Sequence, residues 1–274
     1  MLRFFTLSLV FVLFGCNEVM VTIPEFTPPD TEKTVLIEEL TGVNCPNCPQ
    51  GAAKLQELIE RFPRNVIGVS IHGQFLADPL SNSKYDFRSD MANSLENYLM
   101  PIFGKPAAAF NRVQQPNQNE FAISAFDLWG QFVDAELAKP QTMALDIINT
   151  YNPNTRELNI DVDIEALQDI TGDIRISVMI LESHIIDAQK DVSVIIDDYE
   201  HNHMLRDMLT PFDGRSLTSN LIQNEIFNID FDYTIPDEED ELWIPENMEV
   251  IVFIHEVTPE TKEIFQAAHA DVIN

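Results

Sequence analysis

Two cysteines separated by two residues carry the clearest chemical potential in this 274-residue chain. Cys45 and Cys48 follow a short apolar run, 35–40, and precede a segment, 55–62, whose apolar side chains recur at helical spacing. A strand, a C-x-x-C pair and a helix in this order are typical of a redox dithiol. The pattern therefore predicts thiol–disulfide exchange at Cys45 and Cys48.

The expected helix gives a physical reason for reactivity. A thiolate is the attacking species, and the N-terminus of a helix offers unpaired N–H groups and about half a positive charge. Pro46 suits the first helical position, which needs no N–H partner, so Cys45 is expected to cap the helix. Cys45 is then the predicted nucleophile, and Cys48, one turn into the helix, is the predicted resolving thiol.

Two other interpretations of the pair stay open. The first is half of a zinc site, but such a site needs two more nitrogen or sulfur ligands, and no His-x3–5-His motif follows. The second is a structural disulfide that only holds the loop. No metal and no cofactor is expected.

The first 16 residues are expected to direct export and not to join the fold. Leu13-Phe14-Gly15-Cys16 ends an apolar run and resembles a lipobox, at which bacterial lipoprotein precursors are cleaved and the cysteine is lipidated. The run is too short to span a bilayer, which takes about 20 residues. An ordinary cleaved signal peptide is the alternative. A lipidated Cys16 leaves Cys45 and Cys48 as an even pair in an oxidising compartment.

Composition limits the partners. Residues 17–33 are rich in proline and acidic residues and are expected to form a flexible tether. The formal net charge of −29 excludes nucleic acid, because phosphate binding needs clustered Lys and Arg. It also disfavours adhesion to anionic headgroups, so the membrane contact is expected through the lipid on Cys16. The acidic run 237–241 lacks the glycine of a calcium loop and is expected to be a solvated turn.

Residues 34–139 are predicted to form an α/β domain with parallel strands. A proline at the head of a strand, Pro106, resembles the cis-proline of thioredoxin-like proteins, which lies against the dithiol and whose flanking backbone pairs with substrate peptide. Glu39 lies six residues before Cys45, and thioredoxins carry at that spacing a buried carboxylate that assists proton transfer from the resolving cysteine. A trans-proline on an edge strand and a surface glutamate are the alternatives. His72, at a strand end, either influences the thiolate or caps the strand.

Residues 140–274 are predicted to form an all-β domain. Apolar and polar residues alternate strictly along 158–164 and again along 174–180, which is typical of strands with one buried face. About seven such strands with short turns predict an immunoglobulin-like antiparallel sandwich. The segment 197–215 interrupts the alternation and is expected to be a packed or hydrogen-bonded crossover loop, with the first domain as a candidate packing surface. His201 and His203 could serve a metal only with a third ligand.

The lipobox, the tether, the Glu38–Pro49 stretch and the Tyr199–Arg206 block together resemble the outer-membrane-protein-28-related family of envelope lipoproteins. The resemblance implies an outer membrane lipoprotein that faces the periplasm or the cell surface. The expected function is a thiol–disulfide oxidoreductase whose partners are the thiols or disulfides of envelope proteins. The alternative is a non-enzymatic surface module or adhesin, whose β-sandwich binds an unknown surface ligand.

Overall fold

The computed structural model describes residues 31–237, 242–258 and 261–273. The predicted signal peptide with Cys16, tether residues 17–30 and all but the first residue of the acidic run 237–241 lie outside these ranges. Residues 31–33 pack against the body, because the Gln266 side chain donates to the Glu32 carbonyl at 2.8 Å. No described helix is long and apolar enough to cross a membrane.

The first half begins with two parallel strands joined by a helix, as predicted. Strand β1 (Val35–Thr41) pairs with β2 (Val66–His72), and α1 (Cys48–Arg61) connects them. Every residue of both strands is buried, which explains their near-continuous apolar sequence. Helix α1 lies close to β2, since a Cβ added at Gly68 would meet the Ile59 and Leu55 side chains at about 3 Å.

The remaining elements of the first half extend the sheet formed by these two strands or pack against it. They are α2 (Asp90–Leu99), β3 (Ala107–Phe110), β4 (Ala122–Ile123), the 3-10 helix η1 (Phe126–Leu128) and α3 (Trp129–Leu137). Strand β3 runs antiparallel to β1. Phe121, Ala125, Leu128 and Phe132 recur at helical spacing, but α3 begins only at Trp129, after β4 and η1.

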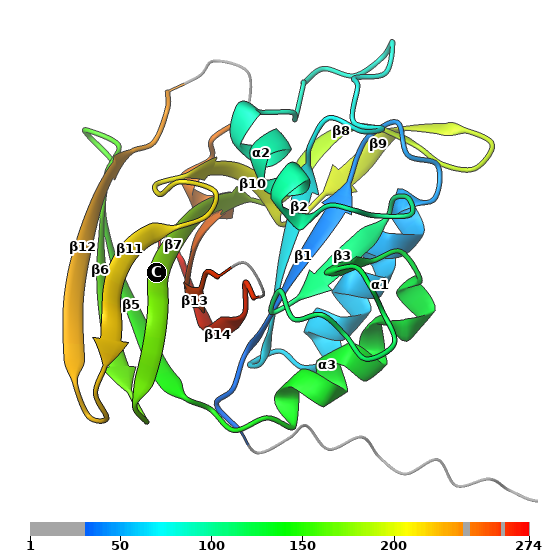
Figure 1. Cartoon of the computed structure of the whole chain (residues 1–274). Coiled ribbons are helices and arrows are strands. Elements are labelled where there is room, and N and C mark those ends of the chain that lie inside the picture. Colours follow the sequence, from blue (N-terminus) through cyan, green and yellow to red (C-terminus); the bar gives the residue numbers. More distant parts are fainter. Residues whose placement is uncertain (1–30, 238–241, 259–260, 274) are drawn as a thin grey trace, which may run out of the picture.

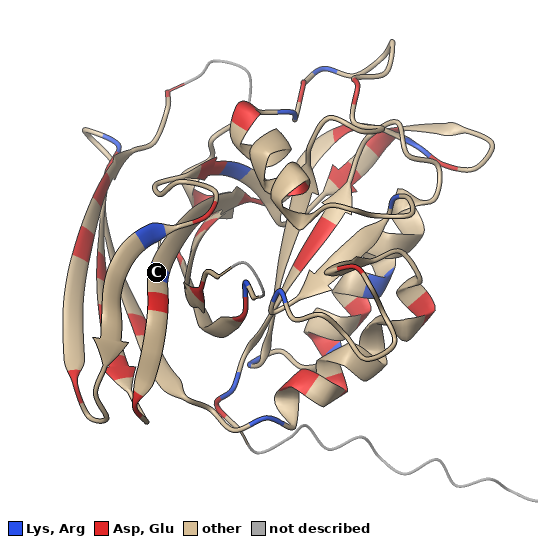
Figure 2. Ribbon diagram, viewed as in Figure 1, with Lys and Arg blue, Asp and Glu red and all other residues tan. Residues whose placement is uncertain are grey.

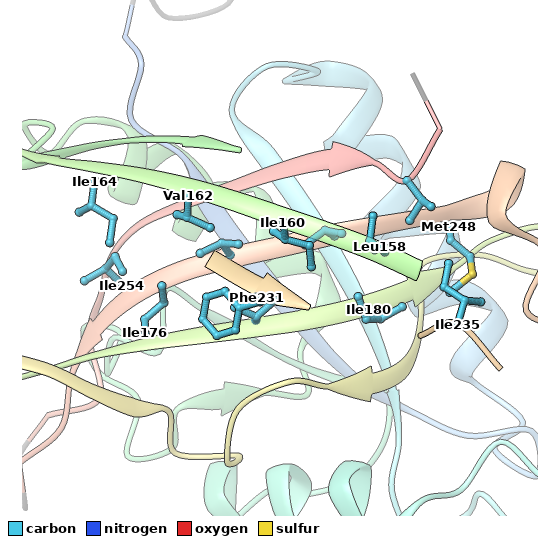
Figure 3. Packing of buried hydrophobic residues seen from close by; sticks show 14 of the residues in the cluster. Leu158, Ile160, Val162, Ile164, Ile176, Ile180, Phe231, Ile235, Met248 and Ile254 are labelled. Carbon is cyan, nitrogen blue, oxygen red and sulfur yellow. The ribbon is translucent and has the colours of Figure 1, made fainter. Parts of the chain in front are cut away.

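The second half is an antiparallel β-sandwich, as the alternation predicted. Its strands are β5 (Met143–Asn152), β6 (Glu157–Ala166), β7 (Ile170–Glu182), β8 (Ile185–Lys190), β9 (Ile195–His201), β10 (Met204–Met208), β11 (Arg215–Leu221), β12 (Ile226–Thr234), β13 (Met248–Glu256) and β14 (Ile264–Asp271), with the 3-10 helix η2 (Pro245–Asn247). A three-stranded sheet, β12-β6-β5, faces β7 and β13. Apolar side chains of both sheets fill the space between them (Figure 3).

One nine-stranded sheet joins the two halves. Its order is β14-β13-β7-β10-β2-β1-β3-β4, and β11 also pairs with β7. Strand β10 lies beside β2 (Figure 1) and runs parallel to it. The Ser70 N–H donates to the His203 carbonyl at 2.7 Å. The prediction of a crossover loop over 197–215 is therefore wrong in form, because the end of β9, β10 and the start of β11 lie there. Strand β10 lies wholly within this segment, and its five residues do not alternate between buried and exposed. The boundary between residues 139 and 140 stays a prediction.

The negative charge is spread over outer faces of the sandwich (Figure 2). Asp161 and Asp163 of β6 and Asp230 and Asp232 of β12 are exposed, while the residues between them turn inward. Asp161 lies directly opposite Asp230. Like charges placed this way are tolerated in water, where their repulsion is weak, so the acidity of these strands fits a solvated face.

Candidate thiol–disulfide site

Cys45 and Cys48 form a disulfide at the start of α1, with their Cα atoms 5.4 Å apart. Cys48 is the first residue of the helix and Asn47 its N-cap. Cys45 therefore does not cap the helix, which starts two residues later than predicted. The positive end of the helix thus lies at Cys48.

The surroundings of the two cysteines differ. Cys45 is fully buried and Cys48 is 2% exposed. Cys48 lines a cavity of about 270 Å³, and Cys45 is not part of its described walls. Of the two cysteines, Cys48 is therefore the one that borders this cavity.

A hairpin from the second half covers the loop that holds Cys45. This hairpin consists of β8 and β9. The Gln189 side chain donates to the Gly42 and Cys45 carbonyls at 3.3 and 3.2 Å, and the Lys190 N–H donates to the Val43 carbonyl at 2.8 Å. Nothing in the local sequence around Gln189 signals this contact, since its partners lie more than 140 residues away.

Glu39 and Pro106 meet at the first turn of α1. A Cβ added at Gly51 would lie 2.5 Å from the Pro106 Cβ and 2.7 Å from Glu39 Oε1, so both side chains press against this glycine. The Lys105–Pro106 peptide bond is cis. Since Gly51 is three residues after Cys48, the structure brings three of the four predicted site residues to one end of α1, with Cys45 just behind them.

Glu39 is an uncharged carboxyl at neutral pH. It is fully buried, and burial raises its pKa to about 8, although the Ser70 hydroxyl and Lys105 act in the opposite direction. Ser70 Oγ donates weakly to Glu39 Oε2 at 3.4 Å, whereas Oε1 has no partner in the described part of the chain. Glu39 also lines the cavity with Cys48. It can therefore give a proton to a thiolate formed there.

The neighbouring Glu38 has a separate, structural role. It forms a two-pronged ion pair with Arg112, at 2.6 and 2.7 Å, on the opposite face of β1. Both side chains are fully buried, and the Arg112 guanidinium lies 4.8 Å from the centre of the Phe253 ring. Adjacent strand residues face opposite sides of a sheet, which distinguishes Glu39 from Glu38.

Two buried histidines complete the cavity. His72 ends β2 and His201 ends β9, and their ring centroids lie 5.9 Å apart. Burial lowers the pKa of His72 well below its usual value and that of His201 to about 4, so both rings are neutral at pH 7. Neither ring nitrogen of His72, and not Nε2 of His201, has a hydrogen-bond partner among the described residues. The distinctive Tyr199–Arg206 block was the only sequence signal for His201 here.

The structure does not support a metal site at His201 and His203. His203 Nδ1 lies 3.3 Å from Glu249 Oε1 and pairs with that carboxylate. Across the three described ranges, no group of three or more His, Cys, Asp or Glu side chains is placed to hold a metal ion.

Solved structures share this fold at low sequence identity. HBP35 of Porphyromonas gingivalis superposes with a TM-score of 0.67 at 14% identity, over 89% of this chain and 76% of that one. Protein AGR_C_4864 from Agrobacterium tumefaciens superposes with a TM-score of 0.53 at 12% identity, over 88% and 96%. These likenesses concern the fold alone. No curated protein matches the sequence.

The family described as outer membrane protein Omp28 matches residues 93–271. The match begins after the dithiol, so it leaves the roles of Cys45 and Cys48 as predictions. A domain of the outer membrane lipoprotein Omp28 from P. gingivalis also aligns in part, with a TM-score of 0.34 at 14% identity, over 48% of this chain and 88% of that one. Because the family match spans more than half of the chain, the protein belongs to the Omp28 family, and its predicted outer-membrane location is confirmed.

Proposed function

We propose that this protein is an outer membrane lipoprotein that carries out thiol–disulfide exchange at Cys45 and Cys48. The observation that carries the proposal is the uncharged Glu39 carboxyl, buried in the wall of the cavity that Cys48 lines. Perturbed titratable groups in a cavity beside a potential nucleophile are typical of reactive sites. A buried carboxyl without a full set of hydrogen bonds costs stability, which suggests a role beyond packing.

The arrangement of elements supports a thioredoxin-like first half. Parallel β1 and β2, joined by α1, hold the disulfide at the end of a helix, and β3 runs antiparallel to β1 directly after cis-Pro106. The second half would be the immunoglobulin-like sandwich. Lipid on Cys16 would attach the protein to the membrane, and the charge of −29 argues against nucleic acid as a partner.

The exchange conserves atoms and electrons. In the reduced protein, a cysteine thiolate attacks one sulfur of a substrate disulfide, forms a mixed disulfide and releases the first substrate thiolate. The second cysteine then attacks the mixed disulfide, releases the second thiolate and restores the Cys45–Cys48 bond. Two electrons pass from the dithiol to the substrate. Glu39 is placed to supply a proton to a leaving thiolate.

Burial of the sulfurs favours a second candidate function. Neither cysteine is more than 2% exposed, as expected of a structural disulfide that does not turn over. The protein would then act through the surface of its sandwich as a binding module or adhesin.

Turnover separates the two functions. The full chain, purified in detergent, should accelerate reduction by dithiothreitol of at least one of two substrates, insulin or bis(2-hydroxyethyl) disulfide. The variant with Cys45→Ser and Cys48→Ser should show only the uncatalysed rate. If wild type and this variant give equal rates with both substrates, the redox function is wrong and the binding module remains.

A further inference from the structure

We propose, resting on the redox function above, that the substrate is a small uncharged disulfide that enters the cavity and reacts at Cys48. A folded protein disulfide is then not the substrate. The proposal comes from the walls of the cavity, from its unpartnered polar atoms and from the cover over Cys45.

The cavity leads from the surface of α1 to the sheet. Exposed Ala53 and Gln56 of α1 and Glu200 of β9 lie at its mouth, and the buried residues Glu39 and His72 lie at its inner end. Its volume of about 270 Å³ is slightly below the usual range for small-molecule sites, which begins near 300 Å³. The cavity can therefore hold a small organic disulfide.

The residues at the inner end of the cavity favour a ligand that forms hydrogen bonds and carries no charge. Glu39 Oε1, both ring nitrogens of His72 and Nε2 of His201 have no partner within the described chain, and all three side chains are at least nine-tenths buried. Each such buried group costs about 1–3 kcal/mol when unsatisfied. None carries charge at pH 7, so a charged ligand would lose its hydration without an opposite charge to meet it. Hydroxyl groups, which donate and accept, fit this lining.

The cover over Cys45 argues against a protein substrate. The hydrogen bonds of Gln189 and Lys190 hold the β8–β9 hairpin on the loop where a polypeptide would have to lie. A ligand can reach Cys48 through the cavity, and Cys48 also lies at the positive N-terminal end of α1. This assigns the attack to Cys48 and the resolving step to Cys45, the reverse of the order predicted from the sequence.

The reaction with bis(2-hydroxyethyl) disulfide then proceeds in two steps. Cys48 thiolate attacks one sulfur, which forms a mixed disulfide and releases one 2-mercaptoethanol thiolate, protonated by Glu39. Cys45 gives its proton to the Glu39 carboxylate left by the first step, and the Cys45 thiolate attacks the Cys48 sulfur. This restores the protein disulfide and releases the second 2-mercaptoethanol thiolate, which takes a proton from solvent. The dithiol is oxidised by two electrons and the substrate is reduced to two thiols, and a dithiol reductant returns the protein to its starting state.

Single-turnover oxidation of the reduced full chain tests the assignment. Each rate is divided by the rate of the same disulfide with free dithiothreitol, because a leaving thiol of lower pKa reacts faster with any thiolate. After this correction, bis(2-hydroxyethyl) disulfide should oxidise the dithiol at least tenfold faster than insulin or the dianionic dithiobis(nitrobenzoate), each at the same disulfide concentration. Ala53→Trp, at the mouth, should slow the first reaction at least tenfold. Glu57→Trp, exposed on the same helix and outside the described cavity walls, is the matched control and should leave the rate unchanged. Gln56→Trp replaces Ala53→Trp if circular dichroism shows misfolding.

Single-cysteine variants identify the attacking sulfur. Mass spectrometry should find the mixed disulfide forming at least tenfold faster on Cys48 in Cys45→Ser than on Cys45 in Cys48→Ser. The inference is wrong if insulin reacts as fast as the small disulfide, if both mouth variants leave the rate unchanged, or if Cys45 reacts first; the redox function survives each of these. If no disulfide oxidises the protein, both proposals fall.

Discussion

Replacing Glu39 by glutamine should change how stability depends on pH. The substitution keeps the shape of the side chain and its ability to accept from Ser70, but it removes the titrating proton. In the wild type, burial raises the Glu39 pKa from 4.5 to about 8. Between these pH values the folded chain holds a proton that the unfolded chain has released. The stabilising contribution is complete below pH 4.5 and is lost as the pH rises through about 8.

The size of the effect follows from the two pKa values. A difference of one bound proton changes the free energy of unfolding by about 1.4 kcal/mol per pH unit. Between pH 5 and pH 8 the wild type should therefore lose about 3 to 4 kcal/mol relative to Glu39→Gln. His72 and His201 act oppositely: their lowered pKa values weaken the fold as the pH falls below 6.5. Comparing the two proteins at the same pH removes this contribution.

Urea unfolding of the oxidised proteins at pH 5, 6, 7 and 8 measures the difference. Glu39→Gln should be about as stable as wild type at pH 5 and more stable by about 3 to 4 kcal/mol at pH 8. Glu60→Gln, on the exposed face of α1, is the control and should stay within about 0.5 kcal/mol of wild type. A Glu39→Gln difference that does not grow with pH would mean that Glu39 is charged in the folded protein, and its proposed proton transfer would be refuted.

Three further substitutions test the packing around the site. Glu38→Gln should lower the free energy of unfolding by about 3–5 kcal/mol in urea titrations, because it leaves Arg112 buried without its carboxylate; simultaneous Arg112→Met should recover part of the loss. Gly51→Ala should cost about 1–3 kcal/mol despite the better helix propensity of alanine, since its Cβ would meet Pro106 at 2.5 Å; a gain in thermal stability would contradict this contact. Gln189→Ala should speed reduction of the disulfide by dithiothreitol, because it removes a hydrogen bond that holds the hairpin over Cys45; alkylation of the freed thiols measures the rate. An unchanged rate would show that the hairpin does not protect Cys45.

The parts of the fold with a local signal could be predicted from the sequence. The mainly apolar runs of β1 and β2 indicated buried parallel strands, and the strict alternation in β6 indicated the inner face of the sandwich. The β8–β9 hairpin has no such signal. Isoleucines 186 and 195 are exposed in it, because its position is decided by contacts with the distant Cys45 loop and not by its own pattern.

The site itself could be predicted only in part. Cys45, Cys48, Glu39 and Pro106 lie within or beside recognisable local patterns, and the structure brings them to one end of α1. The sequence alone does not show which of the adjacent Glu38 and Glu39 belongs to the site. The two residues lie on opposite faces of β1, and their roles differ because α1 packs against one face and Arg112 against the other. The order of the cysteines depended on the helix start, which lies two residues later than the sequence indicated.

The second half of the chain contributes residues to the walls of the site. In the first half alone, β2 would be an edge strand with unpaired backbone groups. Strand β10 pairs with that edge, and the chain leading into it brings His201 to within 5.9 Å of His72, between ring centroids. Without β9 and β10, the cavity would lose the wall opposite α1, and Cys48 would open to bulk water. Residues 34–139 in isolation would therefore lack both the cover over Cys45 and the pocket that selects a small substrate, so the dithiol and the sandwich work as one structural unit.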